Sequence, residues 1–258
     1  MAMILIGLAA LAFGALVAFK VRGTNERINR LERTETVTIS DLRAMQQAAA
    51  EAAGPGHFRY PCEVVGVARA HRDGLITSQL KEIRCVWHRH KITRKYEEFR
   101  RDSKGRRQKE TRHEVVSQHR SGTAFFVEDA SGKVVVRPSG ADVVGAAKPL
   151  NNFVQQQGDR GGVSVGPLTF GGHGGTVGFK HEEWVLREGV QLFVHGEASD
   201  VNGYLEIGKP AESGEYIVSA KSERELLKDE TRELMIGGTM AGVILLGGAV
   251  LLVLGIVL

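Results

Sequence analysis

The histidines are the side chains of this sequence best suited to ligate a metal ion or to transfer protons. There are nine among the 258 residues, and two of them, His88 and His90, follow Cys85 closely. On a β-strand His88 and His90 share one face while Cys85 points to the other. No second cysteine pair and no His-Glu-x-x-His sequence supports a zinc site. We therefore interpret these histidines as surface imidazoles of a basic hairpin and predict neither a metal nor a cofactor.

The other residues that could take part in catalysis do not form a recognisable catalytic motif either. The sequence has no Gly-x-Ser-x-Gly elbow. The adjacent pairs Glu97-Glu98 and Glu182-Glu183 lie in polar surroundings that are typical of a solvated surface. The glycine-rich stretch 158–178 lacks the Gly-Lys-Ser/Thr of a phosphate-binding loop, so we interpret it as a mobile loop. The sequence predicts no catalytic residues.

The segment 84–120, which we call the basic hairpin, is the most unusual polar feature. It carries thirteen Lys and Arg against five Asp and Glu, with Trp87, Tyr96 and Phe99 interleaved. The residues that we predict to contact a polyanion or lipid are its central basic ones: Arg94, Lys95, Arg100, Arg101, Lys104, Arg106, Arg107 and Lys109.

Three partners or states fit such a hairpin. Anionic lipid is the nearest polyanion for a domain beside a membrane, and each basic residue near the surface contributes about 1 kcal/mol. A projecting hairpin that is solvated and binds no ligand is an interpretation of equal standing with lipid contact. Nucleic acid, whose phosphates and bases could meet the cations and aromatic rings, ranks below both.

Apolar segments at the two ends of the sequence indicate that the protein is held in a membrane. Residues 234–258 contain no charged side chain, and about 20 apolar helical residues cross a bilayer core. A helix on the surface of a soluble protein would have a polar face, which is lacking here. We predict a transmembrane helix at 234–258, within a longer helix over 222–258 that begins with a capping box of Ser222 and Glu225.

A second apolar segment, 1–19, is followed by Lys20 and Arg22. Its apolar core is longer than that of a cleaved signal peptide and no basic residue precedes it, so we predict an uncleaved transmembrane helix. Basic residues follow this helix and precede the last one, which predicts that both termini are outside and the middle is cytoplasmic. Either mutual packing or homo-oligomerisation would explain the small residues in the two helices: Gly7, Ala10, Gly14, Ala18, Gly238 and Gly242.

Between the two anchors the sequence predicts a helical juxtamembrane stalk over 20–54 and a β-rich domain over 55–220. Ser40 would cap the second helix of the stalk, and Gly54-Pro55-Gly56 would end it. The stretches 123–128 and 133–137 predict a tight hairpin, and Asn202-Gly203 predicts another. The fold class is α+β: a mainly β soluble domain flanked by one N-terminal and one C-terminal transmembrane helix.

The order of these features resembles a known family. A membrane helix is followed by CEVVGVARA, by a strand with Cys85 and Trp87, by the hairpin TAFFVEDASGKVVVRP, and by a strand framed by two Glu-Gly pairs. The second membrane helix comes last in this order. This order resembles the GIDE family, also called the BAM ("beside a membrane") domain, over about Cys62–Leu258. The framing residues are Glu188, Gly189, Gly196 and Glu197.

The best-known GIDE proteins are membrane-anchored mitochondrial E3 ubiquitin ligases with a zinc-binding RING after the second helix. The present sequence ends at Leu258 and offers no Cys/His set for two zinc ions. The resemblance therefore implies a double-pass membrane protein without a RING, acting as a membrane-side binding or sensing module for a protein or lipid partner. The alternatives are a component of a ubiquitin-protein transferase whose RING belongs to another chain, or a membrane tether for nucleic acid.

Overall fold

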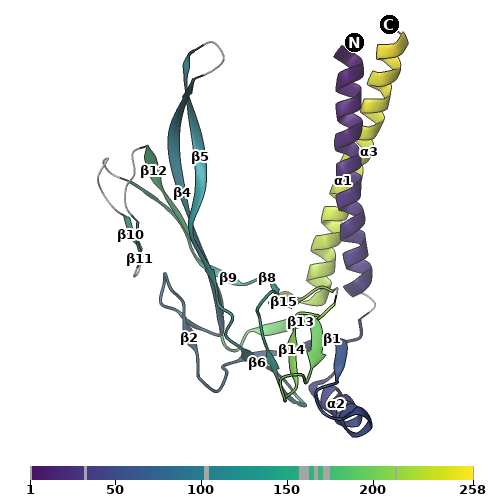
Figure 1. Ribbon diagram of the computed structural model, residues 1–258, viewed down its shortest axis with the longest axis vertical. Helices are drawn as coiled ribbons and strands as arrows, with labels where there is room; N and C mark the ends of the chain where they lie inside the picture. Colours follow the sequence, from purple (N-terminus) through teal and green to yellow (C-terminus); the bar gives the residue numbers. More distant parts are fainter. Residues whose placement is uncertain are drawn as a thin grey trace. The chain divides into compact units, whose positions relative to one another are not determined.

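The chain forms two compact units, which are visible in Figure 1. One unit consists of residues 1–35 and 221–258, and the other of Thr36–Ala220. The computed structural model describes residues 2–31, 34–101, 105–156, 163–165, 168–170, 175–212 and 214–257.

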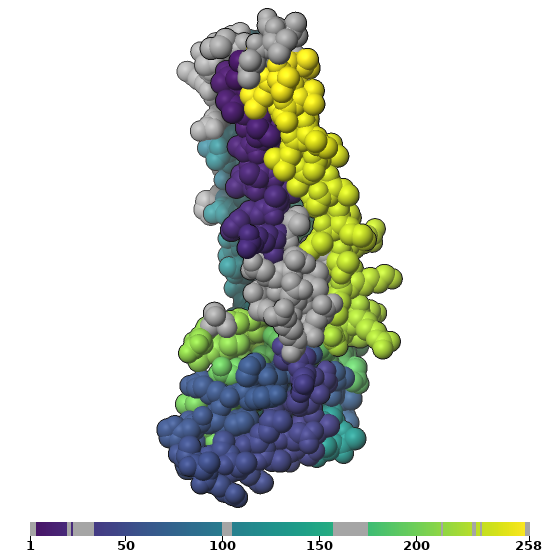
Figure 2. All heavy atoms as spheres, turned by 90° about the vertical axis from the view of Figure 1, so that its right-hand side faces the viewer, coloured from purple at the N-terminus to yellow at the C-terminus, as the bar shows by residue number. Residues whose placement is uncertain are grey.

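The first unit is a pair of antiparallel helices, α1 (Ala2–Leu31) and α3 (Glu223–Val257). Figure 2 shows them side by side, purple against yellow. A Cβ added to Gly7 would lie 2.8 Å from Leu252, and one added to Gly14 would lie 2.8 Å from Leu245. These small residues thus allow the close helix approach that is common in membrane helix pairs. Gly238 and Gly242 have no neighbouring atom within 4 Å of such a Cβ, so their side of α3 does not contribute to this contact.

The start of α3 confirms the predicted capping box. The amide of Ser222 donates to the Glu225 carboxylate at 2.9 Å, and the amide of Glu225 donates to the Ser222 hydroxyl at 3.3 Å. Among the described residues, one helical segment is long and apolar enough to cross a membrane, Leu234–Gly255, with a mean hydropathy of 2.2. The apolar part of α1, Ile4–Phe19, is shorter than that criterion requires.

The second unit contains a small closed barrel. Its ring follows the order β1-β6-β7-β14-β13 and closes through pairing of β13 with β1. The β7–β14 pair is parallel and the other pairs are antiparallel. The strands are β1 (Arg59–Arg69), β6 (Phe125–Asp129), β7 (Gly132–Val136), β13 (Gln191–Ser199) and β14 (Glu206–Gly208). The predicted β6–β7 hairpin is confirmed. Strands β13 and β14 also pair as a hairpin, but residues 200–205 connect them, so Asn202-Gly203 belongs to a longer loop and not to the predicted two-residue turn; Gly203 has a φ of 83° there.

Alternate residues of these strands fill the barrel, as small barrels require. Val64, Val127, Val194 and Ile207 are among the fully buried side chains of this core. Two further strands extend the ring's sheet beside β13: β15 (Ile217–Ser219) pairs with β13, and β8 (Asp142–Val144) pairs with β15. The mainly β character predicted from the sequence is therefore confirmed.

Helix α2 (Ile39–Ala53) belongs to the barrel unit. Its Ile39 and Leu42 are fully buried in the barrel core. The Asp129 carboxylate in the β6–β7 turn accepts a 2.9 Å hydrogen bond from the Ile39 amide, which fixes the helix N-terminus. The cap residue is Thr38 and not Ser40 as predicted, because the Thr38 hydroxyl accepts from the amide of Asp41.

A four-stranded antiparallel sheet, in the order β5-β4-β12-β9, forms the other half of this unit. Its strands are β4 (Trp87–Arg101), β5 (Arg107–Arg120), β9 (Ala147–Gln155) and β12 (Thr176–Leu186). The short strands β2 (Ile76–Thr77) and β3 (Arg84–Cys85) pair with each other ahead of it. Within the predicted loop 158–178, β10 (Val163–Val165) and β11 (Leu168–Phe170) form a small hairpin, and 176–178 belong to β12, so these parts are strands and not loop. Residues 158–162, 166–167 and 171–174 of the prediction lie outside the described ones.

The Glu-Gly and Gly-Glu pairs have identifiable structural roles. The Glu188 carboxylate accepts a 3.0 Å hydrogen bond from the Ala70 amide, and Gly189 has a φ of 84°. A Cβ on Gly196 would lie 2.9 Å from the ring of Tyr216, so only glycine fits there. Glu197 forms an ion pair with Arg59 at 2.8 Å. These residues stabilise the barrel and its entry turn.

Candidate functional site

The basic hairpin consists mainly of β4 and β5, paired from Arg89↔Arg120 to Arg101↔Arg107. Strand β12 accompanies β4 only as far as Tyr96. Beyond that point the hairpin continues as a two-stranded ribbon, the projecting part in Figure 1. We call residues 97–101 and 107–111 the hairpin tip. A two-stranded ribbon has no apolar core of its own, so the tip exposes its side chains to whatever lies beside it.

The structure places the predicted contact residues in two groups. Arg94 and Lys95 lie where the tip leaves the sheet, and Arg106, Arg107 and Lys109 lie on the returning strand or just before it. Arg100 and Arg101 belong to β4, but their side chains, like the whole of Lys104, are outside the described residues. The register places Arg94 and Lys95 opposite Glu114 and His113, and Lys109 and Arg107 opposite Phe99 and Arg101, so the two groups lie at opposite ends of the ribbon.

Acidic neighbours neutralise part of this charge. Arg94 pairs with Glu114 at 3.4 Å, Lys109 with Glu97 at 2.7 Å, and Arg112 with both Glu98 and Glu110. The hydrogen bond from Arg112 to Glu110 raises the pKa of the guanidinium above its ordinary value. The cationic character of the hairpin therefore depends on the basic residues in excess of these pairs.

Aromatic rings hold several of the cations in place. The Arg94 guanidinium lies 4.8 Å from the centroid of Tyr96, and that of Arg107 lies 5.9 Å from the centroid of Phe99. The ammonium of Lys95 lies 6.0 Å from the centroid of Phe153. Such contacts leave the charge available to an anion while they restrict the side chain. Phe99 is itself an exposed apolar residue at the tip.

The base of the same sheet is a buried polar layer. The prediction of surface imidazoles is wrong: His88, His90 and His181 are buried. The pairs His90↔Glu183 and Ile92↔His181 place these side chains on one face of the sheet. Burial, reinforced by nearby His119, lowers the pKa of His88 and His90, and burial lowers that of His181. These rings are therefore neutral in the folded protein at neutral pH.

Hydrogen bonds to Glu183 hold a loop over this buried layer. Its carboxylate accepts hydrogen bonds from the Ser78 hydroxyl (3.0 Å) and from the amides of Leu80 (2.8 Å) and Lys81 (3.0 Å). These bonds hold the loop between β2 and β3 against the sheet, where Leu80 packs with Ile92 and Phe179. The expectation that Glu182 and Glu183 are solvated is wrong, because both are buried. No signal in the sequence shows that a loop will cover this strand.

Few of the described residues could act as nucleophiles or metal ligands. Burial raises the pKa of the Cys62 thiol to about 12 and that of Cys85 to about 11, so neither is a thiolate at neutral pH. No three His, Cys, Asp or Glu side chains in the described part of the chain are placed to hold a metal ion. The arrangement at the hairpin can bind an anion through cations and exposed aromatic rings.

A comparison with known families gives one match. The model of the GIDE family, described as E3 ubiquitin ligase, matches residues 95–255, which is more than half of the chain. The match extends from the basic hairpin through the barrel to the apolar part of α3. Cys85 and Trp87, which contributed to the resemblance, precede it. No curated protein and no solved structure matches the chain.

Proposed function

The chain belongs to the GIDE family, and on this premise we propose that it is a double-pass membrane protein whose β domain binds a partner at the membrane face. The observation that carries the proposal is the apolar segment Leu234–Gly255, of which only 11% is buried. A helix that leaves so many apolar side chains uncovered is stable in lipid and unfavourable in water.

The proposed second span is α1. Its apolar part Ile4–Phe19 packs along α3 through Gly7, Ala10 and Gly14, and Gly248 fits against Ala10. The basic residues after the apolar part of α1 and before the apolar part of α3 support a cytoplasmic β domain with both termini outside. A reporter fused after Leu258 should therefore be external. A cytoplasmic reporter would contradict this topology.

The proposed ligand of the basic hairpin is an anionic lipid surface. The excess of Lys and Arg over acidic partners supports it, as does exposed Phe99, an apolar side chain suited to the interface. A protein partner with an acidic surface is the second ligand class. Nucleic acid is the third, and strongly salt-dependent binding of DNA or RNA by the purified chain would favour it.

Hydrogen exchange of the full chain in nanodiscs tests the lipid proposal. In discs with about one third phosphatidylserine, the hairpin tip should exchange more slowly than in phosphatidylcholine discs, since each basic residue contributes about 1 kcal/mol near such a surface. Arg106→Glu with Arg107→Glu should remove the difference. The matched control, Arg72→Glu with Lys133→Glu, changes the net charge equally outside the hairpin and should retain it. Equal exchange in both lipids would exclude lipid contact.

The family description favours a second candidate function, participation in ubiquitin transfer. In this reading the chain recruits a target while the RING is supplied by another chain. A ubiquitin-transfer assay with an E2 enzyme, with and without a separate RING protein, tests this. Transfer that requires both the RING protein and this chain would support it, and transfer indifferent to this chain would exclude it.

Self-association through α3 is the remaining proposal for a partner. Gly238 and Gly242 form a small-xxx-small pair on a part of α3 without close neighbours at these positions. Gly238→Leu with Gly242→Leu should convert a dimer to monomer in detergent. An unchanged mass would exclude this surface.

A further inference from the structure

A pocket of about 640 Å³ lies between α2 and the outer face of β6 and β7, on a surface that the basic hairpin does not include. Residues from α2, from the loop after β1, from β7 and from the β13–β14 turn surround it. All of these belong to the unit Thr36–Ala220. Its volume falls within the range of sites that hold small ligands or short peptide segments.

The pocket is strongly cationic. Arg43, Arg72 and Lys133 line it as cations beside His71, and none of the described residues that line it is acidic. The Arg43 guanidinium donates to the Lys133 carbonyl oxygen at 2.7 Å, which holds two of these cations together at the rim. Cations gathered without acidic counterparts are favourable only for an anionic ligand.

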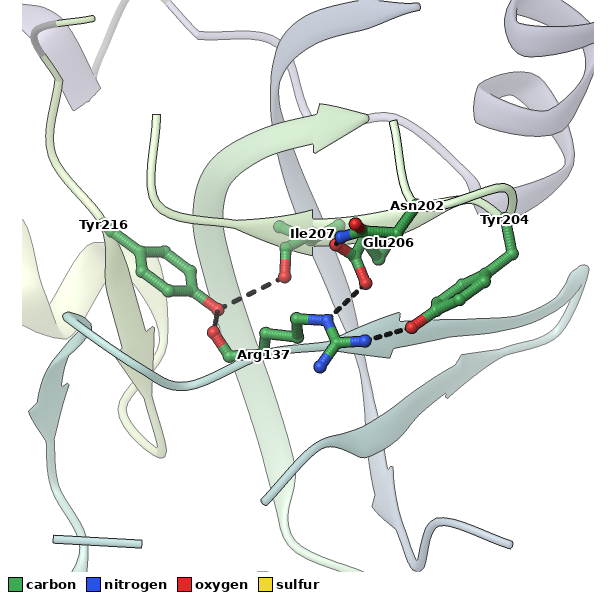
Figure 3. Close-up of polar contacts among 6 residues, drawn as sticks. All are labelled: Arg137, Asn202, Tyr204, Glu206, Ile207 and Tyr216. Carbon is green, nitrogen blue, oxygen red and sulfur yellow. Dashed lines mark hydrogen bonds and ion pairs between the residues drawn. The ribbon is translucent and has the colours of Figure 1, made fainter. Parts of the chain in front are cut away.

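One carboxylate lies beside the pocket: Asp73 hydrogen-bonds to the ring of His71 at 3.2 Å, so the positive charge of the pocket comes from Arg43, Arg72 and Lys133. Two further carboxylates are bound within the barrel. Asp200 accepts from the side-chain amide of Gln46 at 3.3 Å and from the amide of Phe58 at 3.0 Å. Glu206 accepts from Arg137 and Asn202, as Figure 3 shows. These carboxylates therefore stabilise the barrel and do not neutralise the pocket.

The floor of the pocket is apolar. Phe126 and Val135 are register partners of β6 and β7 and point away from the barrel core, yet each is only 9% exposed. The ring of Phe126 already has His71 stacked at 5.3 Å and the ammonium of Lys133 at 4.8 Å. An aromatic base would have to displace these groups in order to stack there. The small exposed remainder of Phe126 and Val135 is apolar, which suits an aliphatic side chain and not an aromatic ring.

One wall is a fixed tyrosine. Tyr204 is 42% exposed, and its hydroxyl accepts a hydrogen bond from the Arg137 guanidinium, which is itself paired with Glu206. Figure 3 shows Arg137 between the two residues. On the α2 side, Gln46 and Gln47 line the pocket with amide groups, which can bond to a peptide backbone. The site thus combines cations, an apolar floor and peptide-type hydrogen-bonding groups.

We propose that this pocket binds a short acidic peptide segment of a protein partner, with an aliphatic side chain on Phe126 and flanking carboxylates at Arg43, Arg72 and Lys133. The inference rests on the proposed binding role of the domain and gives its protein partner a chemical class. The expected contacts are charge-assisted, so binding decreases as salt is added.

Fluorescence anisotropy of the full chain in phosphatidylcholine nanodiscs tests this proposal. The probe is a labelled peptide of four glutamates around a central leucine; the control peptide has lysines in place of the glutamates. The acidic peptide should bind and the lysine peptide should not. Arg72→Glu with Lys133→Glu should weaken binding by about tenfold or more, since two charge-assisted contacts are replaced by like-charge repulsion.

The matched control is Arg106→Glu with Arg107→Glu in the hairpin, which should bind the peptide as the unmodified chain does. The tryptophan emission of each variant verifies folding, because both tryptophans, Trp87 and Trp184, lie in this unit. No binding of the acidic peptide, equal binding of both peptides, or equal loss in both double variants would overturn the pocket proposal. Phosphatidylserine-dependent protection of the hairpin is measured separately, so failure of one proposal is distinguishable from failure of the other.

Discussion

The barrel and the four-stranded sheet belong to one unit, but they hold their strands together in opposite ways. The barrel closes on itself around apolar side chains such as Val64, Val127 and Val194. The sheet stays open, buries histidines and Glu183 at its base, and ends in a cationic two-stranded tip. The barrel is thus built for stability, and the sheet presents charge.

This difference determines how the stability of each region responds to pH and to substitutions. Burial of apolar surface stabilises the barrel at any pH, and its buried Asp200, whose pKa is lowered by hydrogen bonds despite burial, loses its contribution only in stronger acid. The base of the sheet depends on the hydrogen bonds of one carboxylate and on neutral imidazoles. We therefore expect acid and single polar substitutions to affect the sheet, while large losses of stability follow from truncations in the barrel.

The largest expected effect is that of Phe125→Ala in the barrel core. Removing a fully buried phenylalanine should lower the free energy of unfolding by about 3–5 kcal/mol. The matched control, Phe99→Ala at the exposed tip, should change it by less than about 1 kcal/mol. Urea unfolding of the full chain in detergent, followed by tryptophan fluorescence, measures both. Similar losses in the two variants would contradict the division between core and tip.

Glu183→Ala should have the next largest effect. It leaves the amides of Leu80 and Lys81 and the hydroxyl of Ser78 without their acceptor, at a cost of about 2–3 kcal/mol. The control Glu98→Gln, on the exposed ribbon, affects a pair with Arg112 at 3.2 Å and should cost about 1 kcal/mol or less. Hydrogen exchange at residues 78–83 should increase only in the first variant. Unchanged exchange there would show that the loop is held by other contacts.

Acidification should destabilise the base of the sheet. The pKa values of His88, His90 and His181 are lowered in the folded protein, so the unfolded chain binds more protons below the ordinary value of 6.5. Stability is therefore complete above pH 6.5 and decreases as the pH falls from there toward the folded-state pKa values.

His181→Leu should reduce this pH dependence, because both ring nitrogens of His181 are buried without a hydrogen-bond partner. Exposed His113→Gln, on β5, should leave the pH profile unchanged. Thermal unfolding between about pH 5 and 8 spans the range in which histidine titrates. A profile of the His181 variant identical to that of the original chain would mean that other groups cause the acid sensitivity.

The smallest expected effect concerns the ion pairs of the tip. Lys109→Gln removes the contact with Glu97, and such exposed pairs contribute about 0–1 kcal/mol. The free energy of unfolding should therefore stay nearly constant, while phosphatidylserine-dependent protection of the tip should decrease. A marked loss of stability would instead assign the basic residues a structural role.

The sequence predicted the strands and hairpins of the barrel better than the base of the sheet, although it did not predict that they close into a barrel. Alternating apolar residues and turn residues such as Asn202-Gly203 indicate strands and hairpins directly, and the arrangement of basic residues indicated the hairpin tip. The burial of His90 and Glu183 depends on a loop that folds over the sheet from a separate segment. The pocket beside α2 likewise combines residues from four segments whose proximity only the fold creates. Local patterns contain no information about such contacts.

Hydrogen exchange of the full chain in phosphatidylserine and phosphatidylcholine nanodiscs is the most direct test of the division of roles. We predict slower exchange of residues 97–101 and 107–111 in the anionic discs, and no change in barrel strands β1 and β13. Protection that is the same in both lipids, or that appears in the barrel and not in the tip, would contradict the account.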